Sequence, residues 1–198
     1  MVQTPKGWPQ DVRYLHTSSF SKTLTKDILD ALNAKPASQT ALRTVNGPSP
    51  NVTIRAINDS RHPANGQYGL FASKHLAPDS FVLFYIGHVH GEQDSDMTSD
   101  YDLALHRDLG IGVDASKAGN EARFINDYRG VTEKGPNAEF REAWGDLGNG
   151  RFERRMGVFV LPAVKSGRRA GGIKKGEEIL VSYGKGFWKE RKTGEDGP

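Results

Sequence analysis

The sequence predicts a mostly-β fold made of several small antiparallel sheets. From Asn51 onward, short runs rich in β-branched and aromatic residues follow one another, and such runs are typical of strands. Glycine- and proline-containing turns separate these runs, with 23 Gly and 10 Pro in 198 residues. Little of the chain after residue 50 shows the period of a helix. Together these observations favour a compact domain of short strands rather than a helical or α/β architecture.

The first 50 residues differ from the rest and are expected to form a flank with one amphipathic helix. Apolar residues recur there at helical spacing: Leu24, Ile28, Leu29 and Leu32. Thr23 or Thr25 is suited to cap the start of this helix, and Pro36 follows its end. Because an apolar stripe needs a partner, we expect the flank to dock on the main body.

The main domain is predicted to span 51–188, with a C-terminal tail at 189–198. Its expected strands are 51–58, 68–76 and 81–91, then a hairpin of 99–106 and 110–116, then a pair at 137–144 and 155–164, and a closing strand at 177–184. The last pair flanks a turn-rich stretch, DLGNGRFE, at 146–153.

Composition excludes several classes of site. The chain has no cysteine, which excludes disulfide frameworks and thiolate metal sites. His88 and His90 are close in sequence, but two histidines are fewer than the three or four ligands typical of zinc, so no metal site is expected. No leader-like or membrane-spanning segment is evident, so we expect no membrane association.

The net charge is +3, and much of the positive charge falls between Lys165 and Lys175. This stretch has two interpretations. It is a solvated, glycine-rich loop, as most runs of like charge are, or it makes direct contact with nucleic acid.

Two sequence blocks place polar groups at the edge of the predicted core. The first is RFINDYRG at 123–130, and the second is KKGEEILVSYGKGFW at 174–188. These blocks resemble the paired signature motifs of SET-domain protein lysine methyltransferases. From Asn51 to Trp188 the order of the YGLFA, FVLFYIG, GVDAS, RFIN, PNAEF and GEEILVSYG segments is also similar to that family.

The resemblance implies a β-clip (SET-type) fold in which the C-terminal segment forms a pseudoknot. It also implies transfer of a methyl group from S-adenosylmethionine to a protein lysine. Such an in-line transfer requires alignment, exclusion of water and a neutral amine, and it needs no nucleophilic side chain. This chain would be a member without the zinc-binding cysteine clusters that flank many SET domains.

The site residues follow from the same resemblance. Tyr85, Tyr101 and Tyr183 match tyrosines that line the lysine channel, where a ring can wall the apolar stem and a hydroxyl can orient the amine. The implied cofactor-binding residues are Tyr68, Gly69, Arg123, Phe124, Asn126, Asp127, Tyr183 and Trp188.

Two departures from the family pattern bear on activity. Gln67 stands where the family has the first glycine of a Gly-x-Gly turn, and Asp127 stands where it has a histidine. An aspartate cannot donate the hydrogen bond that an imidazole can. A catalytically inactive SET-like binding module is therefore an alternative to an active enzyme, and a basic nucleic-acid-associated domain is a third interpretation.

The expected substrate is a lysine of a partner protein, with a histone tail as the first candidate. A peptide could add as a strand beside 99–106. Acidic residues precede and enter that segment, which suits a basic peptide or forms a solvated acidic loop. They are Glu92, Asp94, Asp96, Asp100 and Asp102. We expect a monomer located in the nucleus, with the cytoplasm as the alternative.

Overall fold

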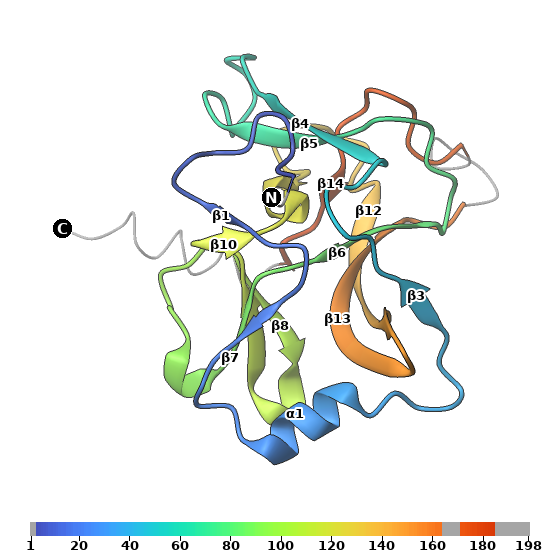
Figure 1. The fold of residues 1–198 in the computed structure, drawn as a ribbon. Coiled ribbons are helices and arrows are strands. Elements are labelled where there is room, and N and C mark those ends of the chain that lie inside the picture. The colour runs from blue at the N-terminus through green and yellow to red at the C-terminus, as the bar shows by residue number, and fades with distance from the viewer. Residues whose placement is uncertain (1–2, 164–170, 185–198) are drawn as a thin grey trace.

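The computed structural model describes residues 3–163 and 171–184. Most of its regular structure is short strands (Figure 1). The helical elements are α1 (Lys26–Asn33) and three single turns, η1 (Glu92–Asp94), η2 (Arg107–Leu109) and η3 (Glu121–Phe124). The strands of the N-terminal half are β1 (Arg13–Tyr14), β2 (Ser19–Phe20), β3 (Ala41–Arg43), β4 (Val52–Ala56), β5 (Tyr68–Ala72), β6 (Phe81–Tyr85) and β7 (His88–Gly91). Those of the C-terminal half are β8 (Asp102–His106), β9 (Ile111–Asp114), β10 (Ala118–Gly119), β11 (Asn126–Asp127), β12 (Ala138–Gly148), β13 (Arg151–Val160) and β14 (Leu180–Val181).

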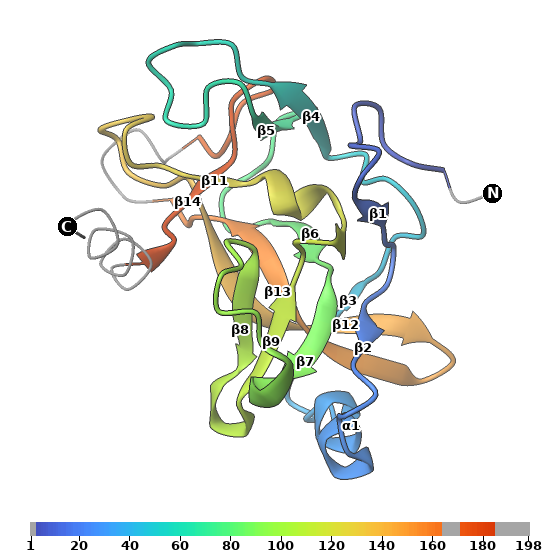
Figure 2. The same ribbon diagram turned by 90° about the vertical axis from the view of Figure 1, so that its left-hand side faces the viewer.

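These strands form several small sheets, which confirms the predicted fold class. Two sheets have four strands, in the orders β3-β12-β13-β6 and β2-β7-β9-β8, and the pairs β1-β10, β4-β5 and β11-β14 form two-stranded sheets. The two four-stranded sheets occupy the lower part of the molecule in Figure 2, and β4-β5 lies above them. The prediction that the sheets are antiparallel is only partly correct, because β3, β2, β1 and β14 each pair in parallel with their neighbours.

The longest hairpin joins β12 to β13. The predicted turn-rich stretch at 146–153 is mostly strand, since β12 continues to Gly148 and β13 begins at Arg151. Asn149 and Gly150 make the turn with φ of 55° and 72°. Two successive left-handed residues match the twist of paired strands, and Asn-Gly is a favoured sequence for them.

The segment 81–91 was expected to be one strand but forms two. The side chain of Asn120 explains the break, because Nδ2 donates to the carbonyl of Phe84 at 2.8 Å and Oδ1 accepts from the amide of Ile86 at 3.1 Å. A side chain from η3's N-cap thus replaces the ladder hydrogen bonds at this point. β6 then joins one four-stranded sheet and β7 the other.

The expected amphipathic helix is α1. Its N-cap is Thr25, whose hydroxyl accepts from the amide of Ile28. Leu32 is buried, and the helix packs against β13. The description of residues 1–50 as a helical flank is nevertheless incomplete, because β1, β2 and β3 each pair with a strand from beyond residue 50. The domain boundary at residue 50 stays a prediction.

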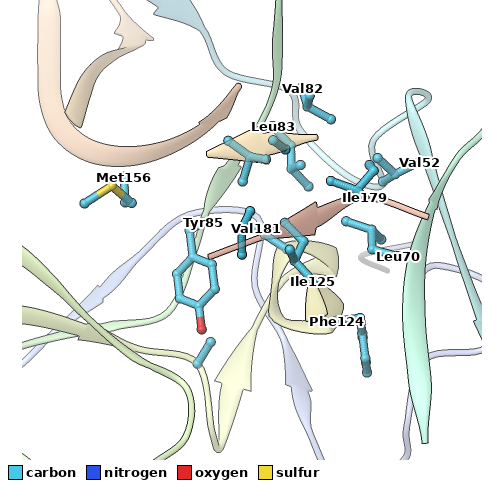
Figure 3. Packing of buried hydrophobic residues seen from close by; sticks show 14 of the residues in the cluster. Val52, Leu70, Val82, Leu83, Tyr85, Phe124, Ile125, Met156, Ile179 and Val181 are labelled. Atoms are coloured by element: carbon cyan, nitrogen blue, oxygen red, sulfur yellow. The ribbon is translucent and has the colours of Figure 1, made fainter. Parts of the chain in front are cut away.

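The closing segment, residues 177–184, contributes to the hydrophobic core and to the candidate functional site. Ile179 and Val181 are fully buried against residues from β4, β5 and β6 (Figure 3). On one side β14 pairs in parallel with β11. On the other, Asn137 clasps the backbone, accepting from the amide of Leu180 and donating to the carbonyl of Glu178, both at 2.8 Å. Contacts on both sides of β14 are those expected of a C-terminal segment that forms a pseudoknot.

A buried histidine links β7 to the edge strand β8 across β9. The ring of His90 contacts the carbonyl of Gly91 through Nδ1 at 3.0 Å and the carboxylate of Asp102 through Nε2 at 3.1 Å. Gly112 lies between them on β9, and a Cβ there would come within 2.8 Å of both side chains. Both ring nitrogens face acceptors, which is the arrangement that suits an imidazolium. Burial lowers the pKa of His90, but the Gly91 carbonyl and the Asp102 carboxylate outweigh burial and raise the pKa above its ordinary value.

This link predicts a pH-dependent contribution to stability. Because the folded-state pKa of His90 is raised, its contribution is fully present below the ordinary value of about 6.5 and is lost as pH rises through the folded pKa. We expect His90→Gln to lower the free energy of unfolding more at pH 5.5 than at pH 8.5. Urea unfolding of both proteins at the two pH values measures this, and an equal loss at both would contradict it.

Candidate functional site

A cleft of about 540 Å³ lies where η3, β11 and the closing segment meet. This volume is within the range of pockets that hold a small molecule. The cleft is lined by Pro9, Asp11 and Val12 from the N-terminal segment, His62, Pro63, Ala64, Gly66, Gln67 and Tyr68 from the β4-β5 connection, Asp100 and Tyr101 before β8, and Arg123, Phe124, Asn126, Asp127, Arg129, Val131 and Tyr183.

A smaller pocket of about 150 Å³ adjoins it. The two cavities share a wall of four residues, Asp100, Tyr101, Arg123 and Tyr183. Beyond this wall the smaller pocket is lined by apolar and aromatic side chains that include Tyr85, Leu103 and Phe140. The arrangement is a roomy cleft beside a smaller, mostly apolar pocket, with one wall in common.

Most of the residues implied by the sequence lie at these two cavities. Those at the large cleft are Tyr68, Tyr101, Arg123, Phe124, Asn126, Asp127 and Tyr183, and those at the smaller pocket are Tyr85, Tyr101, Arg123 and Tyr183. Among the described residues that line the two cavities, Gly69 is absent. Trp188 lies outside the described residues, as do the tail 189–198 and most of the basic stretch 165–175.

The hydroxyl groups of two of the predicted catalytic tyrosines donate to backbone carbonyls. The Tyr183 hydroxyl donates to the carbonyl of Ile125 at 2.6 Å, and the Tyr85 hydroxyl donates to that of Tyr101 at 2.7 Å. Burial raises the pKa of both hydroxyls, and neighbouring ionisable groups, Asp127 for Tyr183 and Tyr183 for Tyr85, raise it further. Both groups therefore stay protonated at neutral pH, and with the hydrogen committed to a carbonyl each oxygen has only lone pairs to offer.

Arg123 brings a fixed positive charge to the shared wall. Its Nε donates to the carbonyl of Ala115 at 2.9 Å and its Nη2 to that of Ser116 at 3.2 Å. The guanidinium lies 4.4 Å from the ring centroid of Tyr101. It also lies 5.0 Å from the ring centroid of Phe124, so two carbonyls and two aromatic rings hold the charge between the two cavities.

An aromatic cluster borders the cleft. Phe124, from η3, makes edge contacts with Tyr68 at 5.8 Å and with Trp8 at 5.5 Å between ring centroids. Trp8 in turn contacts Tyr14, and its Nε1 donates to the carbonyl of Val12 at 2.6 Å. The N-terminal segment therefore supplies part of the cleft's boundary, which the sequence did not indicate.

The Asp127 carboxylate accepts more hydrogen bonds than a neutral imidazole could accept at this position. It accepts from the backbone amides of Tyr183 at 2.7 Å and Arg129 at 2.8 Å, and it pairs with the Arg129 guanidinium at 2.8 Å. The side chain is 4% exposed. The departure at Asp127 therefore ties the closing segment to β11 and does not leave a gap in the site.

Glu178 and His62, which the sequence interpretation missed, form a hydrogen-bond network with Asn126. Glu178 accepts from Asn126 Nδ2 through Oε1 at 2.9 Å and from the ring of His62 through Oε2 at 3.1 Å. The side chains of His62 and Glu178 are 10% and 11% exposed. The only sequence signal was that Glu178 lies inside the closing motif block.

The absence of a side chain at Gly69 leaves room for the Glu178 carboxylate. A Cβ at this position would lie 2.6 Å from Glu178 Oε1. The space that the glycine leaves is filled by this carboxylate, and the cofactor-binding role of Gly69 stays a prediction.

Gly69→Ala should therefore displace the Glu178 carboxylate and destabilise the protein by about 1–3 kcal/mol, as overpacking of a tight site does. Chemical denaturation measures the loss. Gly171→Ala is the matched control, since a Cβ there meets nothing within 4 Å. Equal stability of the two variants would show that Glu178 is not held against Gly69.

Within residues 3–163 and 171–184 there is no cluster of three or more His, Cys, Asp or Glu that could hold a metal ion. No helix in the same residues is long and apolar enough to cross a membrane.

Comparison with known proteins identifies the fold. No family model matches the chain, and no curated protein sequence does. Among solved structures, the chain is similar to the Chaetomium thermophilum polycomb repressive complex 2 in an autoinhibited conformation bound to S-adenosylmethionine, at 22% identity and a TM-score of 0.50, over 76% of this chain and 17% of that one. The apo autoinhibited complex matches at 23% identity and a TM-score of 0.50, over 73% of this chain and 17% of that one. A humanized mutant of the complex bound to an inhibitor matches at 23% identity and a TM-score of 0.50, over 67% of this chain and 15% of that one.

These matches show that the chain has a SET-type fold. The chain spans only about one sixth of the length of the chains it matches, with 15% to 17% of each covered.

Proposed function

We propose that this protein is an S-adenosylmethionine-dependent protein-lysine N-methyltransferase. The observation that carries the proposal is the pair of cavities with a shared wall of Tyr101, Arg123, Tyr183 and Asp100. A transfer between two substrates that enter from different sides needs two sites that meet at one point. The large cleft has room for the cofactor, and the narrow pocket suits the extended stem of a lysine. The SET-type fold supports this assignment.

S-adenosylmethionine, when bound, supplies an electrophilic methyl carbon attached to a positively charged sulfur. The residues at the large cleft fit such a ligand by type, because Phe124 and Tyr68 offer aromatic faces and Asn126 and Arg129 offer polar groups. In the reaction a bond forms from the lysine nitrogen to the methyl carbon, the carbon–sulfur bond breaks with its electron pair kept by sulfur, and the amine gives a proton to solvent.

The task of the protein is to present a neutral amine. A free lysine has a pKa of about 10.4 and is almost wholly protonated at neutral pH. The apolar lining of the smaller pocket disfavours the charged form, and so does the nearby Arg123 guanidinium. The lone pairs on the Tyr183 and Tyr85 oxygens can then accept from the remaining N–H groups and orient the nitrogen.

We further propose that the substrate is a basic peptide, with a histone tail as first candidate and a nuclear location to match. The peptide would add beside β8, an edge strand of its sheet. Asp100 is exposed two residues before this strand and borders both cavities, which would favour a cationic side chain.

Calorimetric titration with S-adenosylmethionine tests the cofactor assignment, and labelled methyl transfer to core histones tests the reaction. Saturable binding with transfer to lysine is expected. Binding without transfer to histones or to a panel of other proteins would favour the inactive binding module. No binding at millimolar cofactor would refute the proposal.

A further inference from the structure

The amide of Asn126 has a fixed orientation. Its Nδ2 lies 2.9 Å from Glu178 Oε1 and 3.3 Å from the carbonyl oxygen of Tyr68. Both neighbours are acceptors, so the NH₂ end of the amide must face them. The two N–H bonds are thereby used, and no donor within the described residues reaches Oδ1. Asn126 lines the cleft, and the part of its amide that these two bonds leave available is an acceptor.

His62 fixes the direction of this network from the other end. Its Nδ1 accepts from the backbone amide of Ala64 at 3.0 Å, so in the neutral ring the hydrogen is on Nε2. That N–H points at Glu178 Oε2, 3.1 Å away. The direction of donation therefore runs from Ala64 to His62, from His62 to Glu178, and independently from Asn126 to Glu178. A carboxylate is the side chain that can accept on both oxygens.

The network joins segments that are far apart in sequence. His62 belongs to the β4-β5 connection that lines the cleft, Glu178 precedes β14, and Asn126 is in β11. The backbone of Glu178 is held by Asn137, and Gly69 leaves space for its carboxylate. Glu178 is thus a rigid reference point for Asn126 and for the wall of the cleft.

Resting on the proposed function, we propose that His62 and Glu178 are positioning residues that select the amino-acid end of the ligand by holding Asn126 with its acceptor toward the cleft. An amide oxygen suits a cationic amine and rejects another acceptor. Arg129 lies in the same cleft, and its guanidinium carries further donors besides the Nη1 that pairs with Asp127. An acceptor and a guanidinium together fit the ammonium and carboxylate of an amino acid.

Glu178→Gln tests this inference because it keeps the shape of the side chain and changes its hydrogen bonding. His62 and Asn126 each contact a different oxygen of the carboxylate, and an amide of the same shape has an oxygen at only one of these two positions. Either the Nε2–H of His62 meets an NH₂ group, or Asn126 turns and presents NH₂ to the cleft. The second outcome places a donor against an ammonium group.

The experiment compares two probes by calorimetry with the 198-residue chain. S-adenosylhomocysteine carries the amino-acid end, and 5′-methylthioadenosine lacks it. We expect Glu178→Gln to weaken S-adenosylhomocysteine binding by about tenfold to a hundredfold, the range for hydrogen bonds to charged groups, and to leave 5′-methylthioadenosine binding unchanged. His62→Ala should act in the same direction by a smaller factor, with Arg61→Ala, an exposed neighbour, as the matched control.

Equal weakening of both probes would show a merely structural role and overturn the inference, as would no weakening of either. Failure of the wild-type chain to bind both probes would instead refute the proposed function and, with it, this inference. Thermal unfolding of the ligand-free variants identifies any that fail to fold, and His62→Ala then supplies the test.

Discussion

Tyr183→Phe is expected to lower the rate of methyl transfer by about a hundredfold or more, while binding of S-adenosylmethionine changes little. The hydroxyl lies at the wall shared by the two cavities and is fixed by its bond to the Ile125 carbonyl. In the proposed reaction its removal deletes one oriented group at the reacting nitrogen, and loss of one such group commonly costs a factor of about 10² to 10³. The large cleft keeps its other lining residues, so the cofactor should still bind. Labelled transfer under single-turnover conditions, together with calorimetry, measures the two quantities separately.

Tyr128→Phe is the matched control, because Tyr128 belongs to the other sequence block, 123–130, and lines neither cavity. Tyr183→Phe also leaves the Ile125 carbonyl without this donor, which is expected to cost about 1 kcal/mol of stability. A wild-type rate in Tyr183→Phe would remove this tyrosine from the catalytic assignment. A parallel loss of cofactor binding would show that the effect is structural.

Glu153→Ala is expected to lower the free energy of unfolding by about 3–5 kcal/mol. Glu153 and Arg155 are two residues apart on β13 and share one face, with side chains 7% and 2% exposed. Arg155 Nε donates to Glu153 Oε1 at 2.6 Å, and its Nη2 donates to the hydroxyl of Thr17 at 3.0 Å. Removing the carboxylate leaves a guanidinium buried without its counter-charge. Urea or guanidinium unfolding gives the value directly.

The same hairpin offers, for comparison, an ion pair whose carboxylate is exposed. Arg154 and Glu142 face each other at 3.0 Å, and the Glu142 side chain is 55% exposed. Glu142→Ala should cost at most about 1 kcal/mol, because water screens and solvates the pair. The double variant Glu153→Leu with Arg155→Met should recover much of the loss, since a buried ion pair can often be replaced by apolar residues. Similar losses in Glu153→Ala and Glu142→Ala would show that burial does not govern the Glu153 pair.

The fold was largely predictable because its strands carry local signals. Alternation and glycine turns located β4, β5, β8, β9 and β12-β13 within a few residues. The break between β6 and β7 was not predictable, because it depends on Asn120, a residue 34 positions further along. The parallel pairing of β1, β2 and β3 was also hidden, since a strand of two or three residues has no period to detect.

The candidate site likewise combines residues that the sequence indicated with contacts that it could not indicate. Motif resemblance brought together residues such as Tyr101, Asn126 and Tyr183, and the structure places them at one pair of cavities. The partnership of His62 with Glu178 spans 116 positions, and His62 lies in an ordinary-looking turn. The reason for Gly69 could not be foreseen either, because it depends on where the Glu178 carboxylate lies.

The clasp of the closing segment between β11 and Asn137 has a consequence for how the protein matures. The cleft is assembled from residues as far apart as Pro9 and Tyr183, and its last component is almost the last part of the described chain to leave the ribosome. Contacts of such long range form slowly, because the intervening chain must be ordered first. A nascent or shortened chain that lacks the closing segment is therefore expected to lack the complete cleft. Conversely, a molecule that binds the cleft favours the docked C-terminal segment, and its affinity adds to the stability of the whole fold.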